Sequence, residues 1–120
     1  MLIGELSRRT GVSRRSLRYY EQHDLLHARR SPNGWRDYDE ATTHRVRIIT
    51  EMIGNGLTLE GVKQLQACLD LHDPSDCDNP DLALTTYQAR LAVVDLRLAE
   101  LQRQRDVLAR QVQSLLGSAW

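Results

Sequence analysis

Arginine and tyrosine side chains recur at short intervals between residues 13 and 22. Arg14, Arg15, Arg18 and Tyr19 fall within six positions, and Ser13 and Ser16 stand among them. A guanidinium group offers a planar fork of donors that matches phosphate oxygens and the edge of guanine. This stretch therefore predicts a surface that binds nucleic acid.

A second group of residues carries thiol and imidazole chemistry. Cys68 and His72 are four residues apart, and Cys77 follows in the polar segment that contains Asp76 and Asp78. If a helix continues through His72, the first two share a face, and all three residues could bind a thiophilic ion such as Zn(II), Cu(I) or Hg(II). Two alternatives stay open. Cys68 is a small core residue and the others are incidental, or the two cysteines respond to oxidation or form a disulfide.

Formal charge is distributed unevenly although the net charge is zero. Residues 1–50 hold ten Arg and six Asp or Glu (10 − 6 = +4), whereas residues 51–120 hold six Lys or Arg and ten Asp or Glu (6 − 10 = −4). The basic half predicts an anionic partner. No Ser/His/Asp set, phosphate-binding glycine loop or paired carboxylates indicates an enzyme, and no run is apolar enough to cross a bilayer, so we expect a cytoplasmic protein without catalytic activity.

The elements that position the arginines form a helix-turn-helix pattern. A first helix is expected at about residues 3–9, a turn at Gly11, and a second helix at 13–22 that Ser13 caps. Leu17 and Tyr20 fall on the inner face of that second helix, so the arginines project from its other sides.

The following segment, residues 28–38, predicts a two-stranded hairpin. Pro32-Asn33-Gly34 is strong turn chemistry, and Arg29, Arg30 and Arg36 flank it. Beside an arginine-rich helix this hairpin is expected to be a wing along the phosphate backbone; the alternative is a surface hairpin with solvated arginines. Two further helices are expected at 40–54 and 59–71. The residues predicted to point inward are Leu25, Leu26, Val46, Ile49, Ile53, Leu59, Val62, Leu65 and Leu69.

The longest predicted element is a helix over residues 80–116. Asn79 and Pro80 provide its start signal, and positions alternating in steps of three and four form a narrow seam. This seam predicts a coiled-coil dimer, with packing onto the chain's own domain as the alternative. Its members are Leu84, Tyr87, Leu91, Val94, Leu98, Leu101, Arg105, Leu108, Val112 and Leu115.

The motifs Thr10-Gly11-Val12-Ser13, Leu17-Arg18-Tyr19-Tyr20-Glu21 and Asn33-Gly34-Trp35-Arg36-Asp37-Tyr38 resemble those of the MerR family of bacterial transcriptional regulators. The order of elements is similar too. Asp24, Ala28 and Trp35 depart from the Gly, Pro and Tyr that are common in this family. Because the chain ends at Trp120, it resembles the short form without a large C-terminal ligand-binding domain.

The resemblance implies an antiparallel homodimer on promoter DNA with a long spacer between the −35 and −10 elements, distorted so that RNA polymerase can engage both. It implies base contacts from Arg14 and Arg15, helped by Ser16. The implied phosphate contacts are Arg18, Tyr19, Arg36 and Tyr38, and Ser13 and Arg30 join this DNA-binding set. In metal-sensing relatives a cysteine precedes the dimerisation helix, and Cys77 resembles it.

These observations predict a mainly α fold: a winged helix-turn-helix DNA-binding domain with a small β-hairpin wing, followed by a long coiled-coil dimerisation helix. The expected boundaries are 1–72 for the DNA-binding domain, 73–79 for a linker, 80–116 for the coiled coil and 117–120 for a tail. The expected function is that of a dimeric, sequence-specific transcription regulator that answers to a metal or thiol signal. The alternative is an effector-independent or architectural DNA-binding protein.

Overall fold

The computed structural model describes residues 1–69 and 80–118. The chain divides into two compact units, Met1–Tyr87 and Gln88–Trp120. In the described residues, no helix is long and apolar enough to cross a bilayer.

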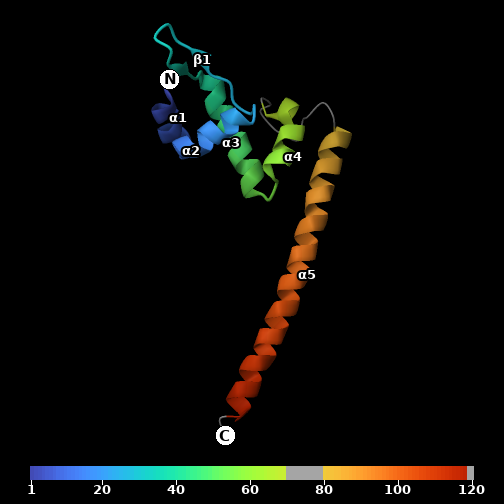
Figure 1. Cartoon of the computed structure of the whole chain (residues 1–120). Helices are drawn as coiled ribbons and strands as arrows, with labels where there is room; N and C mark the ends of the chain where they lie inside the picture. Colours follow the sequence, from blue (N-terminus) through green and yellow to red (C-terminus); the bar gives the residue numbers. More distant parts are fainter. Residues whose placement is uncertain (70–79, 119–120) are drawn as a thin grey trace. The chain divides into compact units, whose positions relative to one another are not determined.

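The first unit contains short helices, a small hairpin and the beginning of a long helix (Figure 1). The order of elements is α1 (Ile3–Thr10), α2 (Arg14–Gln22), β1 (Arg29–Arg30), β2 (Arg36–Asp37), α3 (Glu40–Gly54), α4 (Leu59–Gln64), a 3-10 turn (Gln66–Cys68) and α5 (Pro80–Ser118). The predicted winged helix-turn-helix is therefore confirmed in its element types and order.

The turn between α1 and α2 uses the residues that the sequence indicated. Gly11 has a φ of +73° and its amide donates to the Ser7 carbonyl over 2.9 Å, which closes α1 in the left-handed conformation that glycine tolerates. Ser13 then accepts a hydrogen bond from the Ser16 amide at 3.1 Å and caps α2. The two helices are thus held in a tight turn by local bonds.

The end of α2 has a second left-handed residue, Asp24, with a φ of +60°. The Asp24 amide donates to Glu21 O at 3.0 Å and the Leu25 amide donates to Tyr20 O at 2.9 Å, which is the hydrogen-bond pattern of a Schellman motif. Arg45 of α3 donates from Nε to the Leu25 carbonyl over 2.6 Å. This turn directs Leu25 and Leu26 into the core, where both are buried.

One apolar core joins the helices of the first unit. Of the predicted inward residues, Leu17, Val46, Ile49 and Val62 are fully buried, as are Leu25, Leu26, Leu65 and Leu69, while Ile53 and Leu59 are half-buried at its margin. The sequence pattern missed Ile48 and Met52, which also lie in this core. The core residues are Leu6, Leu17, Leu25, Leu26, Tyr38, Val46, Ile48, Ile49, Met52, Leu57, Val62, Leu65, Cys68 and Leu69.

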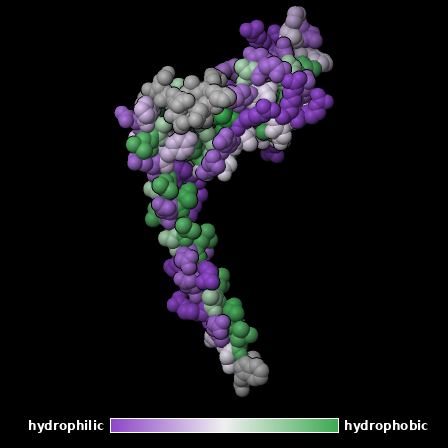
Figure 2. Space-filling view, turned by 180° about the vertical axis from the view of Figure 1, so that it is seen from behind, coloured by the Kyte–Doolittle hydropathy of each residue, from purple (hydrophilic) through white to green (hydrophobic). Residues whose placement is uncertain are grey.

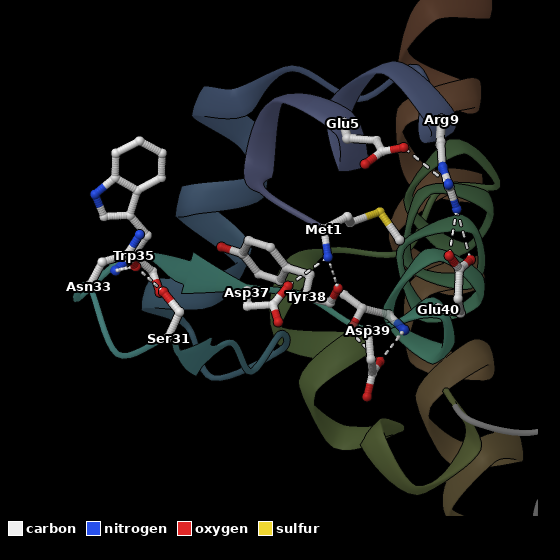
Figure 3. Close-up of polar contacts among 11 residues, drawn as sticks. Met1, Glu5, Arg9, Ser31, Asn33, Trp35, Asp37, Tyr38, Asp39 and Glu40 are labelled. Atoms are coloured by element: carbon white, nitrogen blue, oxygen red, sulfur yellow. Dashed lines mark hydrogen bonds and ion pairs between the residues drawn. The ribbon is translucent and has the colours of Figure 1, made fainter.

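The wing is an antiparallel pair in which Arg29 lies opposite Asp37 and Arg30 lies opposite Arg36. The Ser31 amide donates to the Trp35 carbonyl at 2.8 Å, and the Gly34 amide donates to the Ser31 carbonyl at 2.8 Å. Gly34 has a φ of +81°. A three-residue loop with glycine in the left-handed position matches the predicted turn. The Asn33 side chain accepts from the Trp35 amide at 3.3 Å and steadies the loop (Figure 3).

The prediction of one helix over residues 59–71 is wrong in its extent. The α-helix ends at Gln64, and the chain tightens into the 3-10 turn with bonds from the Cys68 amide to Leu65 O (2.9 Å) and from the Leu69 amide to Gln66 O (3.1 Å). The tighter turn lets Leu65, Cys68 and Leu69 all enter the core.

Helix α5 begins at Pro80, as predicted, and its first two turns belong to the first unit. Thr86 is buried there, and its hydroxyl lies 3.2 Å from Gln64 Oε1 and 2.8 Å from the Leu82 carbonyl. A Cβ on Gly61 would lie 3.5 Å from Thr86 Cγ2, so α4 and α5 approach closely at this glycine. Beyond Gln88, large apolar side chains recur along the exposed length of the helix (Figure 2).

The left-handed Asp24 yields a stability prediction. Replacing Asp24 with Gly should raise the free energy of unfolding by about 0.5–1 kcal/mol, because glycine lacks the Cβ that opposes this conformation. Asp24→Ala should lower it by a similar amount. Asn55→Gly is the matched control, because Asn55 ends α3 with a φ of −87° and gains nothing from glycine. Urea unfolding measures all three; a destabilised Asp24→Gly protein would contradict the argument.

Candidate nucleic-acid interface

The outer face of α2 presents the predicted basic residues to solvent. Arg14, Arg15 and Arg18 are exposed, and Tyr19 is 50% exposed. Leu17 is fully buried and Tyr20 is half-buried against the core, so the helical period separates the two faces as expected. Burial raises the pKa of Tyr20, which agrees with its packing role.

A hollow of about 700 Å³ lies between the start of α1, the helix α2 and the wing. Four guanidinium groups line it, from Arg14 and Arg18 on α2 and from Arg30 and Arg36 on the wing. Glu5 is the one carboxylate in this lining. Four cations around one open hollow make a site for an anion, and phosphate suits their forked geometry.

Gly4 makes room for Arg14 at this hollow. A Cβ placed on Gly4 would lie 2.6 Å from Arg14 Nη2. The Arg14 guanidinium therefore lies against the backbone of α1, so the first helix positions a side chain of the second. Sequence reasoning gave Gly4 no such role.

A second hollow of about 660 Å³ follows the outer face of α2. It is lined by Arg15, Ser16, Arg18, Tyr19 and Gln22. Gln22 was not among the predicted contacts, although its position one helical turn after Arg18 and two after Arg15 is a signal that the sequence contained. A glutamine amide can bond an adenine edge through both its donor and its acceptor.

The Tyr19 ring has a neighbour one turn further along α2. The ring of His23 meets it edge to face, with 4.5 Å between centroids and 67° between planes. This contact restricts the orientation of an exposed tyrosine. His23 was not predicted to take part in the site.

The wing carries its polar surface beside α2. Trp35 is 59% exposed, and its ring points away from Tyr38 in Figure 3. Arg30 and Arg36 stand directly opposite each other across the two strands. Like charges in that arrangement repel, and an anion bound between them would relieve the repulsion.

Tyr38 is placed in the core, which corrects its interpretation as a phosphate contact. It is 1% exposed, and its hydroxyl donates to Glu21 Oε2 at 3.1 Å. Burial, and then the neighbouring Glu21 carboxylate, raise the pKa of Tyr38 to about 12. A side chain held this way supports the wing from inside and does not reach a phosphate at the surface.

Glu21 is the residue that connects the wing to α2. Besides accepting from Tyr38, it holds Arg36, whose Nε lies 3.3 Å from Glu21 Oε1. The sequence pattern placed Glu21 in a motif but gave it no contact. The signal that was missed is its position one helical turn after Leu17, at the edge of the buried face.

Other ion pairs anchor α1 and neutralise charges outside the site. The Met1 amino nitrogen lies 2.6 Å from Asp37 Oδ1, and Arg9 Nη1 lies 2.7 Å from Glu40 Oε1 on α3 (Figure 3). Glu40 and Glu5 raise the pKa of Arg9. Glu40 thus offsets the charge of Arg9, while Arg14, Arg18 and Arg30 remain around the larger hollow together with the Glu21-paired Arg36.

The predicted metal ligands are tested only at Cys68. Its side chain is 2% exposed and disulfide-bonded, and it stands in a 3-10 turn and not on the α-helix that was to align it with His72. His72, Cys77, Asp76 and Asp78 lie outside the described residues. Within residues 1–69 and 80–118, no three His, Cys, Asp or Glu side chains form a group that could hold a metal.

The predicted dimer seam is solvent-exposed in the single chain. Its apolar members from Leu84 to Leu115 are between 39% and 68% exposed. Arg105, the polar member, is also exposed, and its Nη1 lies 3.3 Å from Asp106 Oδ1. A hollow of about 390 Å³ lies along the seam, lined by Leu101, Gln104, Arg105, Leu108, Ala109 and Val112.

Comparison with known proteins agrees with this arrangement. Residues 1–68 match the family model of the MerR HTH family regulatory proteins. The chain is 33% identical to the HTH-type transcriptional regulator HmrR of Rhizobium leguminosarum bv. viciae over 98% of its own length and 88% of that protein. It is 29% identical to the heavy metal-dependent transcription regulator 2 of Rhizobium meliloti (strain 1021), over 90% of this chain and 71% of that one.

A solved structure shares the fold. It is HiNmlR, a MerR family regulator lacking the sensor domain, bound to promoter DNA, and it aligns with a TM-score of 0.59 and 21% identity over 88% of this chain and 78% of the other. The family model covers more than half of the chain, and the helices, wing and basic surface are those that the resemblance implied. This chain therefore belongs to the MerR family of transcriptional regulators.

Proposed function

We propose that the chain regulates transcription by binding a specific promoter sequence as a homodimer. The observation that carries this proposal is the continuous basic surface of α2 and the wing, with Arg14, Arg18, Arg30 and Arg36 around one hollow. The exposed seam of α5 supports the dimer.

The side chains divide between reading and holding DNA. Arg15 and Gln22 line the outer hollow of α2, where a helix in the major groove meets base edges, so we assign them to base recognition with Arg14 and Ser16. Arg18, Tyr19, Arg30 and Arg36 are assigned to phosphates, which fix the register of the protein on the duplex. Ser13 keeps its role as the cap of α2.

The resemblance supports a further step, which we include in the proposal. Two such domains joined by antiparallel helices would hold two half-sites at a fixed separation. Binding energy would then be used to bend and untwist an overlong promoter spacer, so that RNA polymerase engages both promoter elements.

Arginine substitutions test the division between base and phosphate contacts. On a duplex that the protein selects from a random library, Arg15→Ala should weaken the free energy of binding by about 1–3 kcal/mol. It should also relax the preference for one base. Arg36→Ala should weaken binding to selected and random duplexes alike. It should also reduce the dependence of log affinity on log salt concentration (the salt slope) by about one per subunit. Fluorescence anisotropy over a range of salt concentrations measures both.

The control is Arg47→Ala, because Arg47 is an exposed arginine of α3 that lines neither the hollow beside the wing nor the one on the outer face of α2. It should leave both affinities nearly unchanged. If Arg15→Ala and Arg36→Ala have the same effect on both duplexes, the assignment of base and phosphate contacts is wrong.

The dimer proposal depends on the seam of α5. Leu98→Glu should give a monomer in analytical ultracentrifugation, because it places a carboxylate in the centre of the apolar seam. Leu96→Glu is a matched control, since Leu96 is 73% exposed on the same helix and lies off the seam. A dimeric Leu98→Glu protein would show that the interface lies elsewhere.

We also propose that a thiophilic metal ion is the signal, supported by the similarity to the heavy metal-dependent transcription regulator 2 of Rhizobium meliloti. Cys68 in its disulfide-bonded state offers no thiolate, so binding requires reduced protein. Protein purified anaerobically should contain a stoichiometric metal that Cys77→Ser loses and His27→Ala keeps. Two titratable thiols with no metal in the wild type would contradict this and favour regulation without a metal effector.

A further inference from the structure

The basic surface contains a carboxylate at a position where a negative charge opposes DNA binding. Glu21 lines a hollow of about 280 Å³ together with Arg18, Gln22 and Arg36. A carboxylate among phosphate-binding groups repels an approaching duplex. The contacts of Glu21 within the fold indicate what offsets this repulsion.

Both carboxylate oxygens of Glu21 have defined partners. Oε2 accepts the Tyr38 hydroxyl at 3.1 Å, and Oε1 lies 3.3 Å from Arg36 Nε. The Tyr38 ring is fixed in the core, whereas the Arg36 side chain is 46% exposed on a strand of two residues. The contacts therefore run from a buried ring, through a carboxylate on α2, to a partly exposed arginine on the wing.

This chain of contacts restrains the position of the Arg36 guanidinium through an ion pair. Nε forms this ion pair with Glu21 Oε1 at 3.3 Å, and the two Nη groups carry four further N–H donors. An arginine without such a partner loses considerable rotamer freedom when it grips a phosphate. Glu21 also offsets part of the charge of Arg36, which lies opposite Arg30 in the wing.

We propose that Glu21 is a positioning residue for DNA binding, which aligns Arg36 of the wing with the phosphates that α2 engages and is itself held by Tyr38. The inference deepens the proposed function and rests on it. It assigns the wing and the helix to one prearranged surface, since a carboxylate of α2 contacts Arg36 and Tyr38 at the second strand of the wing.

The proposal and a simple count of charges predict opposite changes in DNA affinity when Glu21 is neutralised. Removing a carboxylate from a DNA-facing surface should strengthen binding if only charge matters. If Glu21 positions Arg36, Glu21→Gln should instead weaken binding about threefold to tenfold, which is the cost of ordering one long side chain. The salt slope should fall as well, because one phosphate contact per subunit is held less often.

Glu5→Gln is the matched control. Glu5 is a carboxylate that lines the larger hollow, but it lies within ion-pair distance of Arg8 and Arg9 and not of Arg36. Its removal should strengthen binding modestly, as charge alone predicts. Tyr38→Phe should weaken binding in the same direction as Glu21→Gln, and thermal unfolding of each variant separates this effect from loss of fold.

The decisive measurement is a double-mutant cycle on a labelled random-sequence duplex at low salt and on the selected duplex. In the Arg36→Ala background, Glu21→Gln should strengthen binding or leave it unchanged. Tighter binding by Glu21→Gln in the wild-type background would overturn the proposal, as would an equal weakening with and without Arg36.

Failure of the proposed function gives a different result. A wild-type protein that selects no sequence, yet shows the predicted cycle on the random duplex, would refute sequence-specific regulation and leave the role of Glu21 standing. If the wild-type protein selects a sequence but the double-mutant cycle shows no coupling between Glu21 and Arg36, sequence-specific binding stands and the role of Glu21 is refuted.

Discussion

The burial of Leu17, Leu25 and Leu26 in one core is the constraint on which the arrangement of the first unit depends. Leu17 fixes the rotation of α2 about its axis, so the arginines must face solvent. The leucine pair fixes where α2 ends, through the left-handed Asp24 and the carbonyl that Arg45 holds. The apolar contacts therefore determine the direction of the polar surface, although they include none of its charges.

The distribution of ion pairs decides which positive charges serve the surface. Arg9 is paired with Glu40 and Arg36 with Glu21, while the guanidinium groups of α2 and the wing surround open hollows. The +4 charge of residues 1–50 therefore understates the contrast between the faces of this unit. A protein with no net charge can attract DNA in this way, because the local field and not the total charge acts on a nearby phosphate.

Local signals predicted most of the fold correctly, because their physical causes are local. Gly11, Ser13 and Pro80 set their turn, cap and helix start as expected. Tertiary effects were missed. The sequence gives no sign that α4 stops at Gln64, since Leu65 and Leu69 fit a helical period and only the shared core selects the tighter turn. Tyr38 was assigned to a phosphate contact because the family resemblance implied it, and no local pattern showed that the core covers its ring.

The candidate site shows the same division between local and tertiary information. Residues that project from one helix, such as Arg15 and Arg18, could be placed from periodicity alone. Glu21 could not, because its role depends on two partners that lie 15 and 17 positions further along the chain. From the sequence alone, a carboxylate in a basic motif cannot be distinguished from a solvated surface charge. Its hydrogen bond and its ion pair make the wing arginine and α2 depend on each other, so removing the buried hydroxyl of Tyr38 should alter the basic surface that we propose binds DNA.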